Sequence, residues 1–165
     1  MKKMIFLVFF LAVKLLLVNS AFAQETGERT EEAGPLSFGI GLEWNMSSRH
    51  NFSGGLPVNL IYNLYRDFAL GLNATGSSNF FSMKVIELSI LARSYLQKND
   101  HTGPFIQGEL GTFIIYEDEG ETYMALAGAR LGYRHPIARF LYIEPYGRLG
   151  YPFAFGVGIM AGILF

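Results

Sequence analysis

Eight short runs of alternating side chains fill this 165-residue chain from Leu36 to its end. In each run an apolar residue is followed by a small or polar one, and clusters rich in Gly, Asn, Ser, Asp and Pro separate the runs. A period of two places the apolar side chains on one face of a β-strand. The sequence therefore predicts an all-β fold of eight strands. The runs span residues 36–46, 58–64, 68–75, 86–93, 106–116, 123–133, 141–149 and 155–165.

The less apolar face of these strands distinguishes a barrel in water from a barrel in lipid. In the last run this face carries Gly156, Gly158, Met160 and Gly162, which would not solvate a soluble protein. Small residues suit a narrow lumen, and the continuous face of Leu, Ile, Val and Phe suits hydrocarbon. A sheet in lipid must also close, because an open edge leaves unpaired backbone groups. We therefore expect a closed eight-stranded antiparallel up-and-down transmembrane β-barrel rather than a soluble barrel of lipocalin type.

Composition excludes several other classes of protein. The chain has no cysteine, so it has neither a disulfide scaffold nor a zinc–thiolate site. Its formal net charge of −1 gives no broad basic field, and we expect no nucleic-acid partner. The three histidines, His50, His101 and His135, lie on three different links between strands. We therefore predict no metal site and no cofactor.

The first 35 residues have a different character. Lys2 and Lys3 precede an apolar stretch, and Ala21-Phe22-Ala23 has the small-x-small pattern of a secretory cleavage site. Residues 1–23 are therefore predicted to be a signal peptide, because the apolar stretch is shorter than the roughly 20 residues of a membrane-spanning helix. Residues 24–35 are rich in Glu and predict an acidic, flexible periplasmic leader. The barrel is then expected over residues 36–165.

Two further segments carry a family resemblance. They are the hairpin from Gly128 to Tyr146 and the terminal strand G-V-G-I-M-A-G-I-L-F, which ends in Phe165. Together with the signal peptide and the eight runs, they resemble the small eight-stranded outer-membrane barrels of diderm bacteria, which include the OmpA transmembrane domain and the OmpX, OmpW and opacity-type families. The resemblance implies a monomer in the outer membrane, with its lipids as partners and both termini in the periplasm. Phe165 resembles the C-terminal signal read by the barrel-assembly machinery, so this machinery and periplasmic chaperones are expected partners during biogenesis.

The same resemblance assigns the links between strands to two sides of the membrane. The external links would be short, which disfavours a dedicated adhesin, although Arg49, His50 and Phe52 could contact a partner. The expected external segments are 47–56, 76–82, 117–121 and 151–153, and the expected periplasmic links are 66–67, 97–103 and 135–139.

The inward face carries a set of charges that is nearly balanced. An unpaired buried charge costs several kcal/mol, so this near-balance predicts mutual pairing. Counting from the turns places Arg130 level with Glu109 and Glu144, which predicts a Glu-Arg-Glu ladder. The network could act as a selectivity or gating element in a small pore, but we favour a structural plug of salt bridges. Its predicted members are Glu43, Glu87, Arg93, Glu109, Arg130, Glu144 and Arg148.

Pro145 interrupts the seventh run and removes one hydrogen bond of the ladder. A plain kink is expected there. The alternative is a bulge with a small lateral gap, which in OmpW-like barrels would resemble a side exit for apolar molecules.

Enzymatic activity is not expected. Small barrels that hydrolyse lipid A acyl chains need a serine beside a histidine at the lipid-facing rim. Here the nearest candidates are His50 with Ser47, Ser48 or Ser53, and no G-x-S-x-G elbow occurs. We therefore predict a structural surface protein or a narrow channel for small solutes. The alternatives are surface adhesion through external loops and a lipid A-modifying hydrolase.

Overall fold

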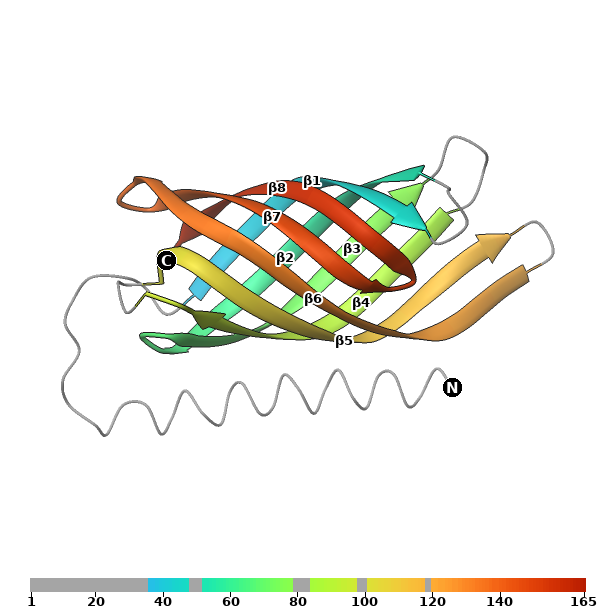
Figure 1. Ribbon diagram of the computed structural model, residues 1–165, viewed down its shortest axis with the longest axis horizontal. Helices are drawn as coiled ribbons and strands as arrows, with labels where there is room; N and C mark the ends of the chain where they lie inside the picture. The colour runs from blue at the N-terminus through green and yellow to red at the C-terminus, as the bar shows by residue number, and fades with distance from the viewer. Residues whose placement is uncertain (1–35, 48–51, 79–83, 98–100, 118–119) are drawn as a thin grey trace. The chain divides into compact units, whose positions relative to one another are not determined.

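A computed structural model describes residues 36–47, 52–78, 84–97, 101–117 and 120–165. All the regular structure in this part of the chain consists of eight strands (Figure 1). No helix among these residues has the length and apolar character needed to cross a bilayer. The strands are β1 (Leu36–Ser47), β2 (Phe52–Tyr65), β3 (Phe68–Ser78), β4 (Lys84–Tyr95), β5 (Gly103–Glu117), β6 (Gly120–Ala138), β7 (Leu141–Tyr151) and β8 (Phe153–Leu164).

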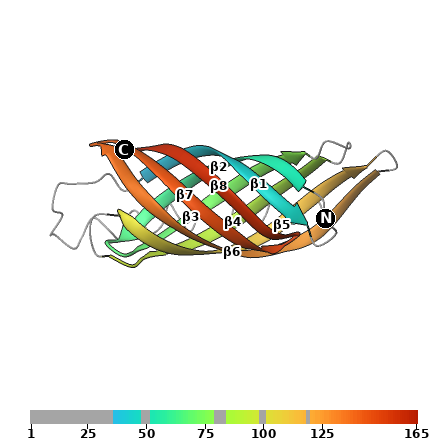
Figure 2. The same cartoon turned by 45° about the horizontal axis from the view of Figure 1, so that its top comes forward.

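The strands form one closed barrel in chain order. Each strand is antiparallel to the next, and β1 pairs with β8 from Ser37 opposite Leu164 to Ser47 opposite Phe153 (Figure 2). The predicted closed, antiparallel, up-and-down barrel is therefore confirmed. The end of the barrel that carries Leu36 and Phe165 is called the turn end below, and the opposite end is called the loop end. Closure leaves no free edge along the middle of the sheet, as a barrel requires.

Side chains alternate between the two faces of the wall. Along β4, Ile90 points outward with 49% of its surface exposed, while its neighbour Leu91 points inward with 2% exposed. The last strand follows the expected pattern too, because Met160 is buried inside and Ile159 is exposed outside. The predicted period of two therefore sets which side chains enter the lumen.

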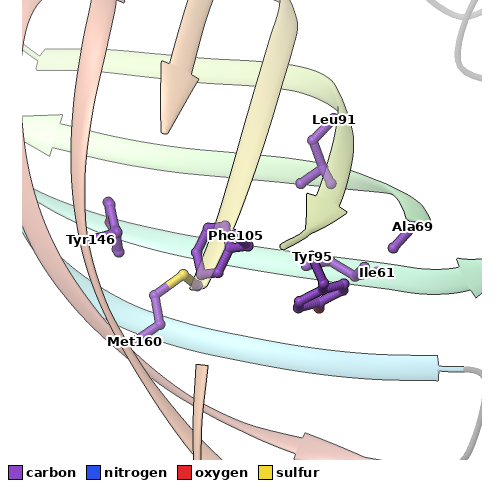
Figure 3. Close-up of a cluster of buried hydrophobic side chains, with 7 residues drawn as sticks. All are labelled: Ile61, Ala69, Leu91, Tyr95, Phe105, Tyr146 and Met160. Atoms are coloured by element: carbon purple, nitrogen blue, oxygen red, sulfur yellow. The ribbon is translucent and has the colours of Figure 1, made fainter. Parts of the chain in front are cut away.

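Apolar side chains fill part of the lumen at two levels. Val85, Phe113 and Leu126 pack together toward the loop end. A larger cluster, with residues from six strands, lies mostly toward the turn end, and Figure 3 shows its side chains. Its members are Ile61, Ala69, Leu91, Tyr95, Phe105, Tyr146 and Met160.

Strand lengths correct the predicted links. β6 is the longest strand with 19 residues and continues to Ala138, so the turn lies at Arg139 and Phe140. The link predicted over 135–139 was wrong because a register shift at Pro136 accommodates this proline within the strand.

At the loop end, β5 and β6 extend past the other strands (Figure 1). The β6–β7 pairing begins at Ala127, so the start of β6 pairs with β5 alone.

Pro145 does not produce a bulge in β7. The β7–β8 register runs without a shift from Leu141 to Leu149, with Pro145 opposite Ile159. On the other side, the β6–β7 register is the same before and after Pro145, although no pair is formed at Pro145 itself. The proline therefore interrupts one ladder locally and leaves the register of the wall unchanged.

Candidate functional site

The charged residues of the lumen are the candidate functional site. Each residue predicted from the sequence points inward from its strand and is at most 2% exposed. The structure adds Arg134 of β6, which is 0% exposed, so four glutamates face four arginines. Arg134 was not among the predicted residues because it lies beside the wrongly placed turn. The signal was present, since Arg134 continues the inward series Gly128, Arg130 and Gly132.

Five of these residues form a loop-end cluster, defined as Glu43, Glu87, Glu109, Arg130 and Arg148. The Arg148 guanidinium lies between two carboxylates, with Nη1 at 2.8 Å from Glu43 Oε1 and Nη2 at 2.9 Å from Glu87 Oε2. Arg130 Nε lies 2.7 Å from Glu109 Oε1, outside the angle of a hydrogen bond, so this contact is purely ionic. Arg130 Nη2 also lies 3.5 Å from Glu43 Oε2.

The remaining three residues form a turn-end cluster, defined as Arg93, Arg134 and Glu144. Arg93 donates two hydrogen bonds to Glu144, from Nη1 to Oε1 at 2.6 Å and from Nη2 to Oε2 at 3.2 Å. Arg134 Nε donates to the same Oε1 atom. Arg93 on β4 and Glu144 on β7 lie on strands that are not neighbours, so this pair crosses the lumen. Bidentate pairs of this kind are strong and directional.

Gln107 joins the two clusters into one network. Its Oε1 accepts a hydrogen bond of 2.8 Å from Arg93 Nε, and its Nε2 donates to Glu109 at 2.5 Å. Gln107 is 0% exposed. A neutral amide can accept from a cation and donate to an anion at once. The network therefore extends without a break from the turn-end cluster to the loop-end cluster.

Aromatic side chains and hydroxyl groups complete the surroundings of the ions. Tyr146 donates from its hydroxyl to Glu43 Oε2 at 2.7 Å. The Arg93 guanidinium lies 3.9 Å from the centre of the Phe105 ring, and the Arg134 guanidinium lies 4.0 Å from the centre of the Tyr142 ring. Cation–π contacts of this kind stabilise desolvated guanidinium groups. None of these aromatic residues was singled out from the sequence.

The predicted ladder is correct for Arg130 and Glu109 but wrong for Glu144. Arg130 stands opposite Arg148 in the β6–β7 register, and Glu144 pairs with Arg93 and Arg134 instead. The cause is the turn at residues 139–140, because the count from the turns had assumed a link at residues 135–139. The arrangement holds two arginines side by side, and the surrounding carboxylates offset their repulsion.

Glycines of β8 provide the space for two of these tyrosines. A Cβ atom at Gly158 would collide with the Tyr146 ring, and one at Gly162 would collide with the Tyr142 ring. The two rings therefore lie directly over the backbone of β8. This close approach explains the glycine-rich inner face that the last strand shows in the sequence.

Some of the residues considered as candidates for a hydrolase site lie outside the described part of the chain. His50 and Ser48 lie outside the described residues. Ser53 faces the lumen and is 6% exposed, away from the lipid-facing rim that a hydrolase would use. Among the described residues, no group of three or more His, Asp or Glu side chains could hold a metal ion. Phe165 lies at the turn end, where its amide donates to the carbonyl oxygen of Leu36 at 2.8 Å and its side chain is 61% exposed.

The closed eight-stranded barrel is the fold of the small outer-membrane barrels. The N-terminal β-barrel domain of Pseudomonas aeruginosa OprF is similar to it with a TM-score of 0.67 and 13% identity, over 81% of this chain and 100% of that domain. Neisserial surface protein A has a TM-score of 0.54 and 10% identity, over 78% of this chain and 94% of its own. Pseudomonas aeruginosa OprG has a TM-score of 0.53 and 8% identity, over 81% and 94%. No family model and no curated protein matches the chain.

Proposed function

We propose that this chain is an integral outer-membrane protein of a diderm bacterium, with its barrel inserted in the bilayer and membrane lipids as partners. This proposal rests on the polarity of the barrel wall, which has apolar side chains on the outside and charged side chains on the inside. Trp44, Leu110 and Leu131 point outward with 56%, 63% and 58% of their surface exposed, while the charged residues are buried inside. In water this outer face would be a large apolar patch, whereas in a bilayer it contacts acyl chains.

Within that class, the geometry supports a structural surface protein better than an open channel. Every charged side chain of the lumen has an oppositely charged partner. These ions are almost completely inaccessible, and apolar clusters lie toward both ends of the network. Such a core holds the wall together and leaves little room for a permeating solute.

Export and assembly follow from the same proposal. Residues 1–23 would direct secretion and be removed, and residues 24–35 would remain as a periplasmic leader ahead of the inserted barrel, residues 36–165. Periplasmic chaperones and the barrel-assembly machinery would act during biogenesis, with Phe165 as part of the C-terminal signal. The closed sheet supports a monomer, because the middle of the barrel offers no edge for a second chain.

Gel mobility tests the membrane barrel directly. The mature protein is refolded in detergent and loaded on an SDS gel with and without boiling. A compact barrel resists SDS until it is heated, so the unboiled band should migrate at a different position from the boiled band. A single band in both lanes, together with a monomer that stays soluble without detergent, would contradict the proposal.

Conductance in planar bilayers tests the closed lumen. Protein from a batch that shows the gel shift should give no current steps above the baseline, because the ion pairs block the passage. Regular steps of constant size would contradict the plug and favour a narrow channel.

The narrow channel remains a second candidate because of polar side chains on β2, β3 and β4. Asn59, Asn73 and Ser89 form one row across these strands on the inside of the wall. Each has a buried oxygen without a hydrogen-bond partner among the described residues, as do Asn63 and Ser77 at other levels. Buried polar atoms in native proteins are normally satisfied by protein or by water. A water-lined route along these strands would pass small solutes, and Asn73→Leu should then reduce any measured conductance.

Surface interaction is supported by a separate feature, the long hairpin of β5 and β6. The start of β6, before Ala127, pairs with β5 alone, and Met124 in this part is 40% exposed. Enzymatic activity is not part of the proposal. Mass spectrometry of lipid A from cells with and without the protein tests this, since a change in acyl chains that His50→Ala abolishes would indicate a hydrolase.

A further inference from the structure

The outer wall of the barrel has a hollow near the loop end. It has a volume of about 630 Å³, and most of the residues that line it point outward from β1 to β5. Gly54 and Gly76 lie in its floor, whereas many other positions of the outer face carry large apolar side chains. A Cβ atom at either glycine would meet no other atom within 4 Å. The hollow therefore exists because two side chains are missing from the lipid-facing surface.

The strand register arranges the surroundings of these glycines. Trp44, Gly54, Ser78, Lys84 and Tyr116 are successive partners across β1 to β5, so they form one row around the outside of the wall. The small residues of this row form the floor, and the two aromatic rings stand on either side. In the adjacent row, Gly76 lies between two large apolar residues that close the hollow toward the turn end: Leu56 and Ile86.

The chemistry of this lining favours a particular occupant. The exposed surface of the hollow is almost entirely apolar, which suits a hydrocarbon chain. Lys84 stands at its edge as the first residue of β4 and is exposed. Within the described part of the chain, Lys84 has no ion-pair partner. Trp44 and Tyr116 lie at the two ends of the row that contains Lys84, and aromatic residues of barrels gather at the level of the lipid headgroups.

We propose that the hollow binds an anionic membrane lipid, with one acyl chain over Gly54 and Gly76 and a phosphate group on Lys84. The inference rests on the proposed function, because it requires the barrel to lie in a bilayer. The lysine and the floor act on different parts of the same molecule, which distinguishes the site from general contact with lipid. A basic side chain near the membrane surface attracts anionic lipid by an amount that corresponds to roughly a fivefold preference.

The fluorescence of Trp44 reports on this site alone, because the chain contains a single tryptophan. The protein is refolded into phosphatidylcholine vesicles that contain equal fractions of either brominated phosphatidylglycerol or brominated phosphatidylcholine. Bromine on an acyl chain in contact with the indole quenches its emission. We expect the phosphatidylglycerol to quench more strongly, with a relative binding constant of roughly five.

Two variants separate the contributions of shape and charge. Gly76→Leu fills the floor, and Lys84→Gln removes the positive charge, so each should abolish the preference for phosphatidylglycerol. The matched control is Gly108→Leu, because Gly108 on β5 also points outward with no atom within 4 Å of its Cβ position and does not line the hollow. This control should keep the preference of the wild-type protein. All variants are first checked for the gel shift of the folded barrel.

The remaining outcomes are distinguishable. Equal quenching by the two lipids in the wild-type protein, or a preference that survives Gly76→Leu, would overturn the lipid site. Weak quenching by both lipids in protein that resists carbonate extraction would indicate another occupant, such as a second copy of this chain, and would also overturn it. Weak quenching in protein that carbonate removes from the vesicles would instead overturn the proposed membrane insertion.

Discussion

Arg148 and Glu87 form an ion pair of 2.9 Å across the lumen, from β7 to β4. The two strands are separated by β5 and β6, so the pair joins opposite parts of the wall. Arg148 holds Glu43 of β1 at the same time. One side chain thereby connects three strands that make no backbone hydrogen bonds with one another.

Removing the Arg148 charge should therefore destabilise the barrel strongly. Arg148→Met leaves Glu87 without its only ion-pair partner among the described residues, and loss of one member of a buried pair costs about 3–5 kcal/mol. Urea unfolding in detergent measures this change. Arg139→Met at the exposed turn is the control and should change the free energy of unfolding by less than about 0.5 kcal/mol. Equal stability of the two variants would contradict a buried network.

Arg134 and Glu144 should be energetically coupled. Both Arg134→Gln and Glu144→Gln should destabilise the barrel, because each leaves a buried charge less well compensated. In the double variant the second change should cost less than it does alone, by about 1–3 kcal/mol. A double-mutant cycle from urea unfolding gives this coupling energy directly. Strict additivity would show that the contact of Arg134 with Glu144 contributes nothing to stability.

Gly158 should not accept a larger side chain. Gly158→Val places a Cβ atom in the Tyr146 ring, and overpacking of this kind costs about 1–3 kcal/mol or more. The folded, heat-modifiable fraction after refolding should fall. Gly108→Val faces open space on the outside and should fold as the wild-type chain does. A normal yield of folded Gly158→Val would contradict the close packing of Tyr146 on β8.

Phe165 should matter for assembly in cells more than for the stability of the folded barrel. Its side chain is 61% exposed, so Phe165→Ser removes little packing and keeps the backbone hydrogen bond to Leu36. We expect less folded protein in the outer membrane but an unchanged unfolding midpoint for the purified barrel. Phe140→Ser is the matched control, because Phe140 is also exposed at the turn end. An equal effect of both substitutions on assembly would contradict a specific signal at Phe165.

The direction of each side chain could be predicted from the sequence because it depends only on alternation along one strand. Glu87 and Arg93 of β4 both point inward, because each directly follows an outward-facing residue of the same strand, Ile86 or Ala92. The length of β6 could not be predicted in the same way. His135 and Pro136 are residue types that are common in links between strands. In the structure they belong to β6, whose register with β7 shifts after Pro136.

Partners across the lumen could not be predicted because they depend on the stagger of every strand around the barrel. Arg93 and Glu144 are 51 positions apart and never neighbours in the sheet, so no local pattern relates them. A change of one strand in register moves every contact on it. This is why the charge balance of the interior was nearly right, while one member, Arg134, was missed and one pairing was wrong.

The division of the ions into two clusters gives the interior an electrical polarity. The loop-end cluster holds three glutamates and two arginines, and the turn-end cluster holds one glutamate and two arginines. Their formal charges are thus opposite in sign, although the whole lumen is neutral. A small cation that entered from the loop end would meet attraction first and repulsion second. Any current through a variant with a loosened plug should therefore rectify, with a preferred direction fixed by the orientation of the barrel in the membrane.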